Sequence, residues 1–154
     1  MTRGRTWAGC ALAASMLLAA CGQESPLETT ETAGPGPGQV LVLVEQGAVG
    51  ALGSDIQQFV ATRPVRVRWG AGTADEIATT VKQGYRFSVV VLPTGPALDR
   101  IRDELLAPPT RLGRLGSTTY WACPVDRYGL PFLRFLTGRT STRVLRAHGF
   151  DVSP

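Results

Sequence analysis

From residue 39 onward, apolar runs alternate with stretches whose apolar residues recur at helical spacing. Val40–Val44 is an unbroken apolar run, and Ser88–Leu92 repeats it after one serine; both are typical of strands buried on two faces. Val65–Trp69 alternates apolar and basic residues, as a strand with one exposed face does. Gly50–Thr62 predicts an amphipathic helix whose buried face comprises Leu52, Ile56, Phe59 and Val60.

The pattern continues with a second helix. Thr73 and Glu76 have the spacing of a capping box, so a helix is expected to begin at Thr73 and to stop at Gly84. The remaining expected elements are a third helix over Leu98–Leu106, a fourth strand over Thr118–Val125, and short helices over Leu130–Leu136 and Thr142–His148, the last capped by Gly149.

Strands and helices that alternate in this way predict an α/β fold. The expected architecture is a single three-layer lobe, with a mostly parallel sheet and helices on both faces. Such sheets bind ligands at the carboxyl ends of their strands. Those ends are Glu45–Val49, Gly70–Thr73 and Pro93–Gly95.

The first twenty residues have the pattern of an export signal. Arg3 and Arg5 precede an uncharged run, Trp7–Ala20, which is too short to span a membrane comfortably. The run ends in Leu18-Ala19-Ala20-Cys21, which resembles the lipobox of bacterial lipoproteins. The resemblance implies cleavage after residue 20, lipid on Cys21, and a protein anchored to the extracytoplasmic face of the cell membrane. An ordinary cleaved signal peptide and an uncleaved anchor remain the alternatives.

Residues 21–38 are expected to be a flexible tether, and residues 39–154 one domain. The tether is rich in Thr, Glu, Gly and Pro and has no apolar periodicity. Its 17 residues after Cys21 give a mean reach of about 23 Å. The domain keeps one cysteine, Cys123, which lies in a β-rich run and is expected to be a buried, unpaired thiol.

The domain carries 14 basic residues against 9 acidic ones, a net charge of +5. Thirteen of the bases are arginine, scattered along the sequence without interleaved aromatic residues. We therefore expect no nucleic-acid partner. A charge of +5 permits attraction to anionic lipid headgroups or to an anionic ligand but does not establish either.

Two stretches resemble a known family. They are Gly70–Ile77 with the following helix and Ser88–Pro93, and the terminal segment from Pro131 to Phe150. Their order and spacing resemble the first lobe of the extracellular solute-binding proteins of ABC importers, of the molybdate-binding kind (type II periplasmic binding proteins). The resemblance implies an oxyanion ligand and an ABC permease as partner.

The chain departs from this family in its length and its site residues. A complete member has a second lobe where this chain runs directly from Val125 to Tyr128, and it has an Asp where this chain has Ser88. Serine hydroxyls of the family's oxyanion site are replaced as well. The candidate ligand-binding residues that remain are Gly47, Ala48, Ala71, Gly72, Thr73, Pro93 and Thr94.

The sequence offers little for catalysis. It has no phosphate loop, no metal-ligand cluster and no serine in a nucleophile elbow, so no enzyme activity, metal or cofactor is expected. Cys123 with His148 is the one nucleophile–base pair to consider, and Tyr120, Trp121, Tyr128 and Phe132 are either pocket or core residues. Two functions stay open: the substrate-binding component of an importer with a reduced site, and a lipoprotein that serves as an interaction module or has lost its ligand.

Overall fold

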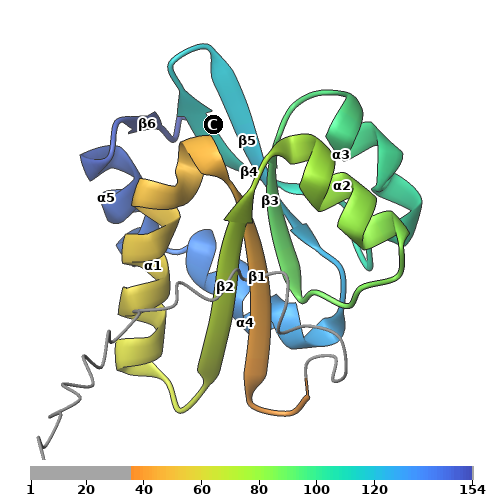
Figure 1. Cartoon of the computed structure of the whole chain (residues 1–154). Helices are drawn as coiled ribbons and strands as arrows, with labels where there is room; N and C mark the ends of the chain where they lie inside the picture. Colours follow the sequence, from red (N-terminus) through yellow and green to blue (C-terminus); the bar gives the residue numbers. More distant parts are fainter. Residues whose placement is uncertain (1–35, 154) are drawn as a thin grey trace, which may run out of the picture.

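The computed structural model describes residues 36–153, which form one six-stranded sheet between two layers of helices (Figure 1). The predicted signal peptide, Cys21 and most of the predicted tether lie outside the described residues. No helix in the described part is long and apolar enough to cross a membrane.

Three parallel strands form one half of the sheet. They are β1 (Gln39–Glu45), β2 (Arg66–Gly72) and β3 (Val89–Pro93), in the spatial order β2-β1-β3. Successive side chains of a strand point to opposite faces, so β1 sends Val40, Val42 and Val44 into one core and Leu41 and Leu43 into the other. The predicted strands buried on two faces are confirmed for β1 and β3.

The helices that connect these strands lie on opposite faces of the sheet. α1 (Val49–Thr62) joins β1 to β2 and packs in the first core, whereas α2 (Ala74–Lys82) joins β2 to β3 and packs in the second. The chain steps outward from β1 to β2 and then back across β1 to β3. Because parallel crossovers are right-handed, this reversal places the two helices on opposite faces.

The prediction of a mostly parallel sheet is wrong, because the sheet is mixed. β5 (Thr118–Pro124) runs antiparallel to β3, β4 (Thr110–Leu115) runs antiparallel to β5, and β6 (Phe150–Asp151) runs antiparallel to β4. Only the two neighbouring pairs that involve β1 are parallel. The sequence prediction included neither β4 nor β6.

A tight hairpin explains the antiparallel pairing of β4 with β5. Leu115 pairs with Thr118, so Gly116 and Ser117 alone connect β4 to β5, and Gly116 has a φ of 60°. A connection of two residues can join only antiparallel neighbours, and it favours glycine where φ is positive. The Gly-Ser pair between β-rich runs was therefore a hairpin signal that the prediction overlooked.

The remaining helices agree with the prediction to different extents. The predicted third helix is too long, because α3 (Pro96–Arg100) is followed by a separate 3-10 turn, η2 (Arg102–Glu104). α4 (Leu130–Leu136) has the predicted bounds, and α5 (Arg139–Ala147) begins three residues early. Two further 3-10 turns, η1 (Gln46–Ala48) and η3 (Arg127–Gly129), precede α1 and α4.

The two cores lie on the two sides of the sheet. In the first, the Phe59 ring packs edge-on against the Phe132 ring at 5.1 Å between centroids, which joins α1 to α4. Val60 on α1 is 42% exposed, so its predicted place on the buried face is wrong. In the second core, Cys123 is fully buried against the α2–α3 side, as predicted.

Candidate functional site

The seven candidate ligand residues gather at the carboxyl edge of the parallel strands, at the top of Figure 1. Gly47 and Ala48 lie in η1 directly after β1, Ala71 and Gly72 end β2, and Pro93 ends β3. Thr73 and Thr94 follow the last two strands. Convergence on one edge is therefore observed, although Ala48 and Gly72 are buried and present no side chain to a ligand.

The backbone at the first of these loops is occupied by a carboxylate of the chain itself. Glu45 Oε2 accepts hydrogen bonds from the Gly47 N–H and from the Tyr120 hydroxyl, both at 2.9 Å. A Cβ on Gly47 would overlap the Tyr120 hydroxyl, so the contact requires glycine. Burial and the Glu45 carboxylate together raise the pKa of Tyr120 to about 12. The Gly47 N–H near the start of η1 is thus bonded to an internal carboxylate.

The second loop is closed in the same way. Thr73 and Glu76 form the predicted capping box. Glu76 Oε2 accepts from Thr73 N at 2.8 Å and from Thr73 Oγ1 at 2.9 Å. In return, Thr73 Oγ1 accepts from Glu76 N. These hydrogen bonds from Thr73 lower the pKa of Glu76. The one hydroxyl of this turn therefore has its donor and acceptor capacity committed to the helix end.

The third loop is held by the neighbouring strand. The Thr94 N–H donates to Thr119 O at 2.8 Å, and the Trp121 indole N–H donates to Thr94 Oγ1 at 2.7 Å. Trp121 is half-buried, and this bond fixes its ring against the end of β3. The sequence analysis did not find this partner, because it placed Trp121 in a strand without knowing which strand lies beside it.

The carboxyl edge therefore carries two carboxylates, on Glu45 and Glu76, at the positions where an oxyanion would accept N–H bonds. A bound oxyanion would have to displace both and would meet like charge at close range. At this edge the Gly47 and Thr73 N–H groups are therefore already bonded to carboxylates of the chain itself.

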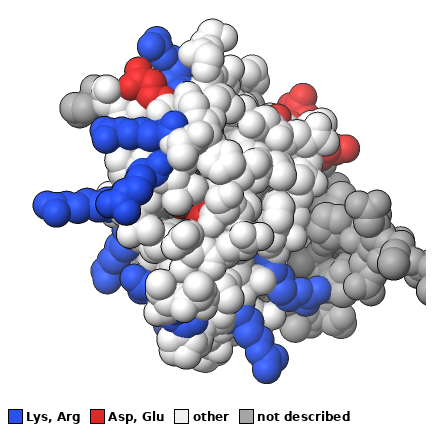
Figure 2. Space-filling view, turned by 90° about the vertical axis from the view of Figure 1, so that its left-hand side faces the viewer, with Lys and Arg blue, Asp and Glu red and all other residues white. Residues whose placement is uncertain are grey.

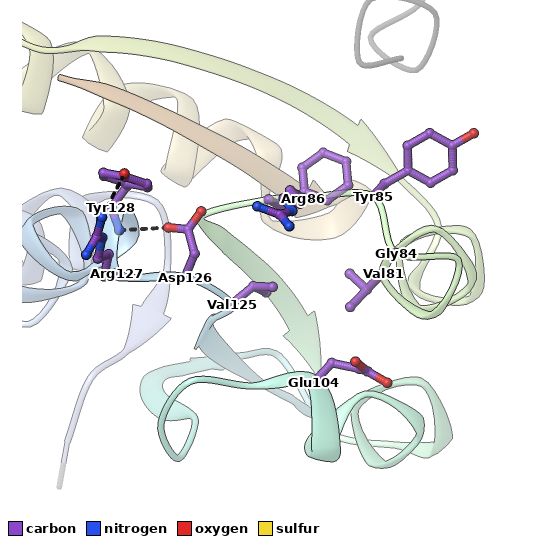
Figure 3. A pocket seen from close by; sticks show the side chains of 10 residues that line it. Val81, Gly84, Tyr85, Arg86, Glu104, Val125, Asp126, Arg127 and Tyr128 are labelled. Carbon is purple, nitrogen blue, oxygen red and sulfur yellow. Dashed lines mark hydrogen bonds between the residues drawn. The ribbon is translucent and has the colours of Figure 1, made fainter. Parts of the chain in front are cut away.

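A pocket of about 430 Å³ lies at the opposite edge, near the start of β3 (Figure 3). Its lining comes from the end of α2, from η2 and from the turn after β5, and comprises Val81, Gly84, Tyr85, Arg86, Phe87, Glu104, Val125, Asp126, Arg127 and Tyr128. Among these residues, only Tyr128 was expected from the sequence as a possible pocket residue. The signal that could have pointed here is the pair of Tyr-Arg neighbours, Tyr85-Arg86 and Arg127-Tyr128.

Asp126 at this pocket makes hydrogen bonds that stabilise the turn after β5. Asp126 Oδ1 accepts from the Tyr128 and Gly129 N–H groups at 2.7 and 3.2 Å, the first of which is drawn in Figure 3. Burial raises the pKa of Asp126. The two backbone hydrogen bonds, the Ser88 side chain and the positive charge of Arg86 all counteract this rise. The buried Ser88 Oγ also accepts from Leu41 N at 3.1 Å. Ser88 is thus a structural residue that ties β1 to the turn after β5.

Cys123 and His148 do not form a pair. Cys123 is fully buried on the α2–α3 side of the sheet, and burial raises the pKa of its thiol to about 12. His148 is exposed at the end of α5 on the other side, where its Nε2 lies 3.1 Å from Ser54 Oγ. Tyr120 and Phe132 lie in the first core. These two side chains therefore do not line the aromatic pocket that was considered from the sequence.

Compared with known proteins, the chain matches no family model, and no curated protein matches its sequence.

Proposed function

We propose that this protein is an extracytoplasmic lipoprotein, anchored through Cys21, whose α/β domain acts as an interaction module rather than as an oxyanion receptor. The proposal keeps the resemblance to one lobe of a type II periplasmic binding protein as the source of the fold. It assigns no transported ligand to the lobe.

The observation that carries this choice is the closure of the carboxyl edge. Glu45 accepts from the Gly47 N–H in η1, and Glu76 accepts from the N–H of Thr73, the N-cap of α2. The Thr94 hydroxyl accepts from the Trp121 indole N–H. One-sided contacts from a single lobe would in addition leave an anion largely hydrated, so little binding free energy would remain. Both arguments favour the interaction module over a reduced importer component.

A thermal-shift screen tests the ligand half of the proposal. A ligand that binds the folded state alone raises its stability by mass action. We expect molybdate, tungstate, sulfate and phosphate to leave the melting temperature at the value measured in chloride of equal ionic strength. A concentration-dependent rise with one of the four oxyanions would restore the importer function.

Fractionation of a bacterial host tests the anchor. The wild-type protein should sediment with membranes, and its mature N-terminus should be a lipidated Cys21 in mass spectrometry. Cys21→Ala should leave an unprocessed precursor or a soluble product, whereas the matched Cys10→Ala variant should be processed as the wild type is. An unmodified mature N-terminus at another residue would contradict the lipoprotein assignment.

A further inference from the structure

The two helical layers differ in charge, although the basic residues look scattered along the sequence. On the side of α1, α4 and α5 there are five exposed arginines, Arg63, Arg134, Arg139, Arg143 and Arg146, which we call the basic face. The single carboxyl group on these three helices, Asp55, is buried. Basic residues that are scattered along the sequence thus come together in part on one side of the folded domain.

The opposite helical layer is acidic, and all of its basic residues are paired. α2, α3 and η2 carry five acidic residues and three basic ones, and each base pairs with an acid of the same layer. The ion pairs are Lys82–Glu104 at 2.8 Å, Arg100–Asp75 at 2.7 Å and Arg102–Asp99 at 2.9 Å. By contrast, no ion pair within residues 36–153 involves an arginine of the basic face.

Helical geometry aligns three of these arginines. Arg139, Arg143 and Arg146 are spaced i, i+4 and i+7 on α5, so they share one side of the helix. Ser141 and Leu145 are the buried residues of α5 and lie on its other side. Figure 2 looks onto this part of the molecule and shows blue side chains gathered toward one flank and the lower border. Red atoms appear there only near the upper border and as one small central spot.

We propose that the basic face docks on the surface of an anionic lipid bilayer, with the α5 arginines against headgroup phosphates. Guanidinium groups suit phosphate because their planar fork donates two parallel N–H bonds. Within residues 36–153 these arginines form no ion pair with a carboxylate that would compete with phosphate. The inference rests on the proposed anchor in one respect. With lipid on Cys21, only 17 residues would separate the anchor from Gln39, so the domain would stay close to the headgroups.

The start of the domain lies near α4, whereas α5 lies farther away, toward the upper left of Figure 1. The described chain begins before β1 at the lower end of the sheet, and α4 lies at that same end (Figure 1). Arg134 on α4 is exposed and belongs to the basic face. A chain anchored in the bilayer through its N-terminal segment therefore enters the domain beside one part of the basic face.

Vesicle cosedimentation tests the proposal without the lipid anchor. The protein is the chain from residue 21 onward with Cys21→Ser, which keeps the whole sheet and both cores. The probes are vesicles of phosphatidylcholine with phosphatidylglycerol and vesicles of phosphatidylcholine alone. We expect binding to the anionic vesicles only, and stronger binding at an ionic strength of about 0.01 M than at about 0.15 M, because salt shortens the Debye length.

Two triple variants of equal charge change locate the binding surface. The first triple variant, R139Q/R143Q/R146Q, should weaken the partitioning of the protein onto anionic vesicles about a hundredfold. The reason is that each basic residue near an anionic surface contributes about a factor of five. The second triple variant, K82Q/R100Q/R102Q, removes the same charge from the other helical layer. Its partitioning should stay within about threefold of the wild-type value. Arg143→Gln alone, expected to weaken partitioning about fivefold, replaces the first triple variant if that one does not fold.

The outcomes separate this inference from the anchor. Equal losses in both triple variants, or no binding to anionic vesicles at low salt, would overturn the basic face as a bilayer surface while leaving Cys21 lipidation untouched. Retention on a nucleic acid or an acidic protein without vesicle binding would assign the face to another polyanion and also overturn it. If the fractionation shows no lipid on Cys21 while the protein still binds anionic vesicles, the basic face remains a bilayer surface and the proposed anchor is wrong.

Discussion

Asp55 on α1 is fully buried, and its Oδ2 accepts a hydrogen bond of 2.8 Å from Ser141 Oγ on α5. Its Oδ1 has no hydrogen-bond partner among the described residues. Burial raises the pKa of Asp55 from 3.8 to about 6, and the bond from Ser141 offsets only part of that rise. At neutral pH the fold therefore keeps a charged carboxylate where the neutral acid would be preferred.

This burial makes stability depend on pH. A carboxyl group whose pKa is higher in the folded state stabilises the fold below pH 3.8 and loses that contribution as the pH rises through about 6. Asp55→Asn keeps the acceptor for Ser141 and removes the charge. The unfolding free energy of the wild type should fall relative to Asp55→Asn by roughly 3 kcal/mol between about pH 3 and about pH 8. Urea unfolding at several pH values measures this difference, and a constant difference would contradict it.

Ser88 offers a second residue-scale prediction. Its buried Oγ accepts from Leu41 N at 3.1 Å, and its side chain helps to hold down the pKa of Asp126. Ser88→Ala leaves a buried N–H and a partly buried carboxylate without this partner, so the unfolding free energy should fall by about 1–3 kcal/mol. Ser117→Ala, at an exposed position of the β4–β5 hairpin, is the control and should change it by less than about 0.5 kcal/mol. Equal effects would show that Ser88 has no special structural role.

At the scale of elements, the capping box of α2 separates a structural role of Thr73 from a ligand-binding one. Thr73→Ala removes the side chain that bonds Glu76 N, which should cost about 1 kcal/mol of stability. Thr79→Ala in the exposed middle of the same helix should be neutral or slightly stabilising. Chemical unfolding checks both, and a loss in Thr79→Ala as large as in Thr73→Ala would contradict the cap.

The elements that the sequence predicted are those with strong local signals. The apolar runs of β1 and β3, the capping box of α2 and the apolar stripe of α1 each depend on neighbouring residues. β4 was missed because Thr110–Leu115 carries two arginines and a glycine, and its pairing with β5 and β6 is what makes it a strand. The direction of β5 depended on the two-residue hairpin, whose signal was present but not used.

At the scale of the whole molecule, both cores share the strands of one sheet. Val42 belongs to the first core and Leu43, its neighbour on β1, to the second. Leu52→Ala on α1 and Leu92→Ala on β3 should each cost about 2–5 kcal/mol, because both side chains are fully buried. Each variant should lower one common, cooperative melting transition. Calorimetry that resolves two separate transitions would contradict a single folding unit.

The site was only partly predictable from the sequence, and the reason lies in tertiary contacts. Strand ends identified the edge at which Gly47, Thr73 and Thr94 meet. The Tyr120 hydroxyl that completes the Glu45 contact comes from a strand 75 residues away, so no local pattern indicated it. The basic face likewise arises when separate helices pack on one side of the sheet, which a count of charges along the chain does not show.

Glu45 and Glu76 accept from the Gly47 and Thr73 N–H groups, so an added oxyanion should find these groups occupied. A backbone-amide NMR titration with tungstate tests this most directly, because it reports on the Gly47, Thr73 and Thr94 N–H groups individually. We expect these three resonances to move no further than they do in sodium chloride of equal ionic strength. Saturable shifts of the three, with a common midpoint in the micromolar range, would contradict the closed edge and would identify it as an oxyanion site.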